Sequence, residues 1–197
     1  MKRVITHEDA KELFTYLSGK TISLVGNAQS LLEKEQGELI DSSDVVMRIN
    51  RGYPVDFKRH GTKTNVVWMN NRFVGDKVIS DYLRTSKFFY YVLEGGNNKS
   101  EIESCLIKGD IYNWNDVWNV HKPEMKKMPS QGFVIIYMIY KEIDCKLNLF
   151  GFDFMKTKIQ MPRPELHIDR TTSPHDFETE KRLVEQMFSE RKDWRIY

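Results

Sequence analysis

The sequence predicts an α/β layered fold, with a mostly parallel central sheet flanked by helices in one domain over residues 1–197. Short apolar runs rich in β-branched and aromatic residues alternate with longer helix-like stretches. This alternation is typical of a parallel sheet covered by helices. A chain of 197 residues without internal repeats or a linker-like stretch is large enough for one hydrophobic core.

The first half of the chain begins with a short helix over residues 6–17, in which Thr6 is the expected N-cap and Asp9 the third helical residue. TISLVG at 21–26 is a compact apolar run that ends in glycine, as expected of a buried strand. Residues 28–35 are expected to begin a helix. Three further strands share β-branched and aromatic residues, and they are DVVMRIN at 44–50, TNVVWM at 64–69 and KFFYYV at 87–92.

The second half contains the two strongest helix candidates. Residues 132–143 include FVIIYMIY and are apolar enough for a buried helix, which KLNLFG at 146–151 follows as a strand. Residues 176–191 place their apolar side chains near one helical face. The closing DWRIY at 193–197 is expected to form a last strand.

Composition excludes several classes of protein. The 30 basic and 28 acidic residues leave a net charge of +2, which argues against a nucleic-acid partner bound through bulk electrostatics. No run reaches the roughly 18 to 20 apolar residues of a membrane-spanning helix, and the N-terminus does not resemble a signal peptide. Cys105 and Cys145 lack metal-site or redox spacing. We therefore expect a cytoplasmic protein with both thiols free.

Residues suited to ligand binding lie at the ends of three of the predicted strands. In a parallel sheet, ligands bind outside the carboxyl ends of the strands, where Gly26-Asn27, Asn50 and Gly151 are all expected. VGNAQSL places a glycine and an asparagine between a strand and a helix, an arrangement that suits a phosphate group. A strand-to-helix turn without a ligand explains this stretch equally well. The pattern is neither a Rossmann fingerprint nor a Walker A motif.

Two further stretches allow either a functional or a structural interpretation. Arg48 and Asn50 end a predicted strand and, by alternation, point to the same side, either toward a cleft or into an edge-strand ion pair. In PSQGF, Ser130 and Gly132 precede the long apolar helix. The serine hydroxyl and the backbone amides suit a ribose or a phosphate, but an ordinary helix cap has the same sequence.

The five histidines differ in their surroundings. His7, His60 and His121 lie in charged or loop-like sequence, so we expect them at the surface. His167 and His175 lie close together in a proline-containing connection before the last helix. The helix N-terminus favours the neutral, base-competent form of His175. An exposed capping histidine is the structural alternative.

Taken in order, these stretches resemble the motifs of glycosyltransferase family 29, the sialyltransferases. The large motif of that family is matched by VGNAQSL at 25–31, IDSSDVVMRIN at 40–50 and GTKT at 61–64. The small motif is matched by PSQGF at 129–133 and LFGF at 149–152, the very small motif by His175 and Glu180, and a third motif by His167 in LHI. The resemblance covers roughly residues 21–188, with Gln131 where threonine is common in the family.

The resemblance implies a GT-A-like fold and the transfer of sialic acid, or a related ulosonic acid such as Kdo, from a CMP-activated donor to a glycan acceptor without a metal ion. It implies that His175 is the general base, that His167 hydrogen-bonds the departing phosphate and that Glu180 supports the local structure. The implied donor-binding residues are Asn27, Ala28, Asn50, Ser130, Gln131, Gly132, Gly151, Phe152 and His167. Residues 94–128 are the expected acceptor-binding region.

Two other functions are compatible with the sequence. The first is another enzyme of nucleotides or phosphate esters that shares the VGN-x-x-S-L element, and such an enzyme would more often require magnesium. The second is a CMP- or glycan-binding module without catalysis, which would bind CMP but release none. A nucleic-acid reader fits least well, because no basic stripe accompanies the tryptophans.

Overall fold

The computed structural model describes residues 3–4, 10–50, 52–70, 86, 88–92, 111–113, 123, 125–156 and 173–197. One sheet runs through these residues in the order β1-β6-β5-β4-β3-β2-β7-β8, and all the described neighbours are parallel. Its strands are β1 (Arg3–Val4), β2 (Thr21–Val25), β3 (Val45–Ile49), β4 (Val66–Asn70), β5 (Phe88–Val92), β6 (Ile111–Asn113), β7 (Lys146–Phe150) and β8 (Arg195–Ile196).

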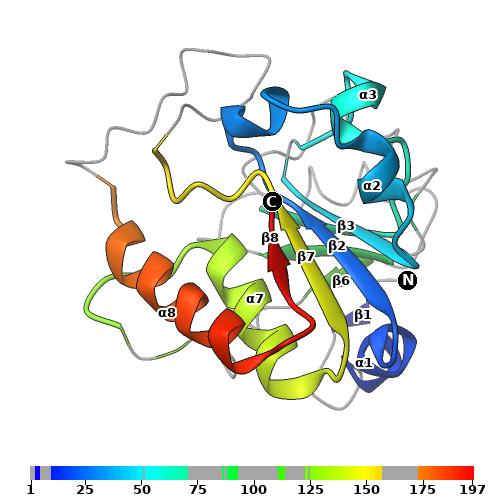
Figure 1. Ribbon diagram of the computed structural model, residues 1–197. Helices are drawn as coiled ribbons and strands as arrows, with labels where there is room; N and C mark the ends of the chain where they lie inside the picture. Colours follow the sequence, from blue (N-terminus) through cyan, green and yellow to red (C-terminus); the bar gives the residue numbers. More distant parts are fainter. Residues whose placement is uncertain are drawn as a thin grey trace, which may run out of the picture.

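The helices cover both faces of this sheet (Figure 1). Their bounds are α1 (Ala10–Leu17), the 3₁₀ turn η1 (Gln29–Leu32), α2 (Gly37–Asp41), α3 (Phe57–His60), α7 (Gln131–Glu142) and α8 (Phe177–Glu190). Buried side chains of α1, α7 and α8 share one apolar cluster with alternate residues of the central strands. Side chains of η1 and α2 form a smaller cluster with the intervening strand residues.

Side chains that alternate along each strand explain why there are two apolar clusters, one on each face of the sheet. In β2, Ile22 and Leu24 contribute to the larger cluster, whereas Val25 contributes to the smaller one. In β3, Met47 likewise contributes to the larger cluster and Val46 to the smaller one. Because both faces are covered, each strand can be almost entirely apolar, as expected for a parallel sheet. The predicted layered α/β fold is confirmed.

The direction of strand succession changes at β2. From β2, the chain adds β3, β4, β5 and β6 on one side, and β7 and β8 on the other. The carboxyl ends of adjacent strands open a crevice at such a switch point, where ligands of α/β sheets bind. Gly26 follows β2 and Gly151 follows β7, and the Gly26 amide donates to the Phe150 carbonyl over 2.8 Å. The fold therefore brings the two glycines together at this point.

The predicted strands at 21–26, 44–50, 64–69, 87–92 and 146–151 correspond closely to β2, β3, β4, β5 and β7, and the closing stretch contains β8. The helices predicted at 132–143 and 176–191 are α7 and α8. The helix expected to begin within 28–35 is only the short turn η1, in which the Ala28 side chain supplies no cap. The proposed Thr6 cap and Asp9 lie outside the described residues. The sequence interpretation missed α2, α3 and the short strands β1 and β6.

Candidate active site

A cavity of about 280 Å³ lies at the carboxyl ends of β2, β3 and β7, beside the first turns of α7 and α8. We call it the central cavity. Its lining includes Gly26, Asn27, Ala28, Asn50, Ser130, Gln131, Gly132, Gly151, Phe152, His175 and Glu180. Every predicted site residue in the described part of the chain is in this set. His167 lies outside the described residues, as does most of the expected acceptor region at 94–128.

Asn27 and Asn50 form the edge of the cavity next to β2 and β3. The Asn27 Nδ2 atom donates to the Ile49 carbonyl over 3.0 Å, which holds the side chain across the strand ends. Its Oδ1 atom is buried and has no hydrogen-bond partner in the described part of the chain. Asn50 has a φ of 52°, a left-handed conformation that asparagine tolerates better than most residues. This conformation ends the alternation of β3 directly after Ile49.

Glycines are required where the backbone packs around Phe152. A Cβ atom added at Gly26 would lie 2.4 Å from the Gly151 carbonyl oxygen and 3.0 Å from the Phe152 ring. A Cβ atom at Gly132 would lie 2.9 Å from the same ring. Side chains at these positions would displace the ring, so the two glycines and Phe152 together set the shape of the cavity.

Ser130 is the N-cap of α7 and also connects that helix to α8. Its Oγ atom accepts a hydrogen bond from the Phe133 amide over 3.3 Å and donates to Glu180 Oε2 over 2.6 Å. The Ser130 amide donates to Glu180 Oε1 over 2.7 Å. Both oxygens of one carboxylate thus hold a single residue at the start of α7. The first turns of the two helices are fixed relative to each other.

Glu180 is buried in the first turn of α8, with 1% of its surface exposed. Burial raises the pKa of its carboxyl, and the hydrogen bonds from Ser130 oppose that rise because they favour the charged form. A carboxylate in this position needs both donors, since an unpaired buried charge is costly. Glu180 is therefore a positioning residue for the cavity wall.

Gln131 follows the cap and has unusual surroundings. Both Oε1 and Nε2 of its side chain are buried, and neither has a hydrogen-bond partner in the described residues. Buried amide groups are nearly always paired, with protein or with another group. Together with Asn27 Oδ1, the carboxamide provides donor and acceptor atoms at the cavity that no described residue satisfies.

His175 is half-buried at the cavity wall, directly before α8. Its Nδ1 atom lies 2.8 Å from the Met128 carbonyl oxygen. A carbonyl can only accept, so Nδ1 carries the proton in this contact, and the lone pair of a neutral ring would then lie on Nε2. The N-cap of α8 is Asp176, whose side chain accepts from the Thr179 amide. The interpretation of His175 as a capping residue is therefore wrong.

Two expectations about nearby polar residues are also wrong. Arg48 does not face a cleft with Asn50, because its side chain is fully buried and donates to Thr64 Oγ1, the His60 carbonyl and the Lys63 carbonyl. It holds the GTKT segment against β3. His60 is not at the surface: 2% of it is exposed, and its Nδ1 accepts from the Val55 and Asp56 amides.

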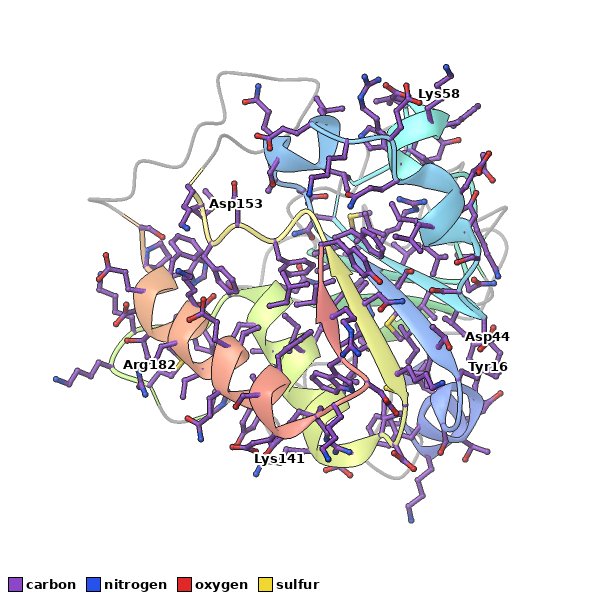
Figure 2. All side chains as sticks on the ribbon, in the orientation of Figure 1. Tyr16, Asp44, Lys58, Lys141, Asp153 and Arg182 are labelled. Atoms are coloured by element: carbon purple, nitrogen blue, oxygen red, sulfur yellow. The ribbon has the colours of Figure 1, made fainter. Side chains whose placement is uncertain are left out.

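Some cavity residues were not found from the sequence. Phe154 and Met155 have φ values of 54° and 64°, and both line the cavity together with Phe177. Left-handed backbone at two successive non-glycine residues is uncommon and costs energy, but nothing in the local sequence indicates it. Figure 2 shows Asp153, the residue before Phe154, on the segment that leaves β7. Within the described ranges, no helix is long and apolar enough to cross a membrane.

Comparisons with known protein families and solved structures concern the family and the fold of the chain. The family model for glycosyltransferase family 29 (sialyltransferase) matches residues 3–109. A search of curated protein sequences found no match. Among solved structures, a mammalian sialyltransferase is similar to this chain with a TM-score of 0.58 and 17% identity, over 100% of this chain and 80% of the other.

Two bacterial enzymes are also similar. The sialyltransferase CstII from Campylobacter jejuni, solved with the substrate analogue CMP-3FNeuAc, has a TM-score of 0.60 and 15% identity over 90% of this chain and 81% of its own. An α-2,3-sialyltransferase from Campylobacter jejuni has a TM-score of 0.54 and 16% identity over 98% and 76%. At these identities the likeness shows the fold, and the family model covers more than half of the chain. The chain belongs to glycosyltransferase family 29, the sialyltransferase family, and is a glycosyltransferase.

Proposed function

We propose that this protein is an inverting transferase that moves sialic acid, or a related ulosonic acid such as Kdo, from CMP to a hydroxyl group of a glycan. The observation that carries this proposal is the position of His175 at the wall of the central cavity, with Nδ1 on the Met128 carbonyl. This contact leaves Nε2 as the basic nitrogen. A neutral imidazole beside a ligand cavity suits a general base at neutral pH.

The donor nucleotide would bind across the start of α7. This helix has 12 residues, and its N-terminus favours a phosphate group. Asn27 Oδ1 and the Gln131 carboxamide, which find no partner among the described residues, would receive polar groups of the nucleotide. The remaining donor-binding residues of the proposal are Ala28, Asn50, Ser130, Gly132, Gly151 and Phe152. His167 would contact the departing phosphate.

The chemistry needs only one base and stabilisation of the leaving group. His175 Nε2 would take the proton of the acceptor hydroxyl while its oxygen bonds to the anomeric carbon. The bond between that carbon and the phosphate oxygen would break, and its electron pair would leave with CMP. Attack opposite the leaving group inverts the anomeric centre. Because CMP is already a good leaving group, we propose that no metal ion takes part.

The test is release of CMP from CMP-sialic acid and from CMP-Kdo, measured in EDTA with and without glycan acceptors. Replacing His175 with alanine should lower the rate by about 10²- to 10⁴-fold, while CMP still raises the melting temperature. Gln186→Ala, on the exposed side of the same helix, is the matched control and should keep full activity. The proposal would be refuted if the wild type showed no CMP binding and no CMP release. A magnesium requirement would refute its metal-free part.

A further inference from the structure

A second cavity, of about 580 Å³, adjoins the central cavity at the start of α8. We call it the α8 cavity. Phe154, His175 and Phe177 line both cavities, so these three side chains form the boundary between them. The proposed base is thus accessible from two sides. A transferase needs this geometry, because donor and acceptor must reach the reacting centre from different directions.

The charges around the α8 cavity are unequal. Its lining carries four cationic side chains and three carboxylates besides His175. Of the carboxylates, Asp176 caps α8 and binds Thr179, and Glu185 pairs with Lys181 over 3.4 Å. Of the three carboxylates in the lining, Glu178 is the one without such a hydrogen bond or ion pair to another α8 side chain in the described residues.

Three cations remain available to a ligand. Lys127 precedes α7, Lys156 follows β7, and Arg182 lies on α8. They come from three separate segments, and all three are exposed. None of them forms an ion pair within the described part of the chain, although the charge of Lys127, after the hydrogen bonds from Thr179, helps to lower the pKa of the Asp176 carboxyl. Figure 2 shows the Arg182 side chain extending from α8 on the side away from the sheet.

The boundary between the cavities is aromatic. The rings of His175 and Phe177 pack edge to face, with centroids 5.6 Å apart. Phe154 has a φ of 54°, a left-handed conformation that phenylalanine does not favour. Aromatic faces pack against the apolar C–H surface of sugar rings, while cations at the rim bind acidic substituents.

We infer that the α8 cavity is the acceptor subsite and that Lys127, Lys156 and Arg182 select an acceptor glycan with a carboxylate or another acidic group near the reacting hydroxyl. This inference rests on the proposed function. The acidic group would bind the cations, and a hydroxyl of the same glycan would reach His175 Nε2. These cations also offset the repulsion between an acidic acceptor and the anionic CMP-sugar donor.

The test compares matched acceptors in the CMP-release assay. Lactose is the neutral probe, and lactobionate and sialyllactose are the acidic probes. We expect kcat/KM for at least one acidic probe to exceed that for lactose by roughly tenfold, with the advantage decreasing as salt is added. CMP release without acceptor measures the donor site independently.

A triple variant, Lys127→Gln, Lys156→Gln and Arg182→Gln, should lose the preference for acidic probes and keep the acceptor-free rate. The control variant, Lys141→Gln, Lys146→Gln and Lys192→Gln, removes the same charge outside the cavity lining and should keep the preference. Because all six side chains are at the surface or at its edge, melting temperatures should change little.

Equal or better use of lactose by the wild type would overturn the inference. It would also be overturned if no acidic probe raised CMP release above the acceptor-free rate, or if the two triple variants behaved alike. In all three cases donor hydrolysis would still proceed. If the wild type showed neither CMP binding nor CMP release, the proposed function would be overturned, and this inference with it.

Discussion

Ser130 connects the two helices that border the central cavity, so its replacement by alanine tests the reasoning about the site most directly. Its hydroxyl caps α7 through the Phe133 amide and also donates to the buried carboxylate of Glu180. Loss of an N-cap costs about 1 kcal/mol, and loss of a hydrogen bond to a charged group costs about 2 kcal/mol. We therefore expect Ser130→Ala to lower the free energy of unfolding by about 3 kcal/mol.

The N-cap of α8 supplies a matched control. Asp176 accepts hydrogen bonds from Thr179 without contacting a buried charge, so Asp176→Ala should cost only about 1 kcal/mol. In a protein of this size, the melting temperature should fall by about 6–12 °C for Ser130→Ala and by about 2–4 °C for Asp176→Ala. Both should be measured without CMP at a pH of about 8, where ordinary carboxyl groups are ionised.

A double-mutant cycle isolates the contribution of the carboxylate. In a Glu180→Gln background the partner of Ser130 is neutral, so Ser130→Ala should cost only about 2 kcal/mol. The reasoning would be refuted by equal losses for Ser130→Ala and Asp176→Ala. Strict additivity of Ser130→Ala and Glu180→Gln would refute it as well, because the helices would then not be coupled through this carboxylate.

Three further predictions concern buried polar groups. Because burial raises the pKa of Glu180 above its ordinary 4.5, the folded protein holds that proton more tightly than the unfolded chain does. The resulting stability is fully present below pH 4.5 and is lost as the pH rises through the raised value. In urea titrations, the stability of the wild type relative to Glu180→Gln should fall across that window, and a constant difference would contradict this. Gln131→Met removes, at similar volume, a buried carboxamide that has no partner among the described residues, so it should raise the free energy of unfolding by about 1 kcal/mol while weakening CMP binding in calorimetry. Unchanged CMP affinity would exclude Gln131 from the donor site. Burial also raises the pKa of the Cys145 thiol to about 12, so in a Cys105→Ser variant iodoacetamide should react with it only after unfolding. Rapid alkylation of the folded variant would disprove this.

Local patterns in the sequence are enough to predict the α/β class and most of the sheet. TISLVG, DVVMRIN and KLNLFG form the adjacent strands β2, β3 and β7, because continuous apolar runs can only be buried on both faces of a covered sheet. Glycine and asparagine at their ends also predicted where a ligand would bind, since the carboxyl ends of parallel strands meet at one edge. These signals are local, so the sequence alone contains them.

Contacts between the polar residues of the site depend on how distant segments pack, which local patterns do not reveal. Alternation placed Arg48 and Asn50 on the same side, but Asn50 leaves the strand conformation while the guanidinium of Arg48 is buried against the 60–64 segment. Ser130 and Glu180 are 50 residues apart, and no local period relates residues at that distance. Their contact arises because α7 and α8 pack on the same face of the sheet. Long-range packing, rather than local pattern, therefore determines the chemistry of the site.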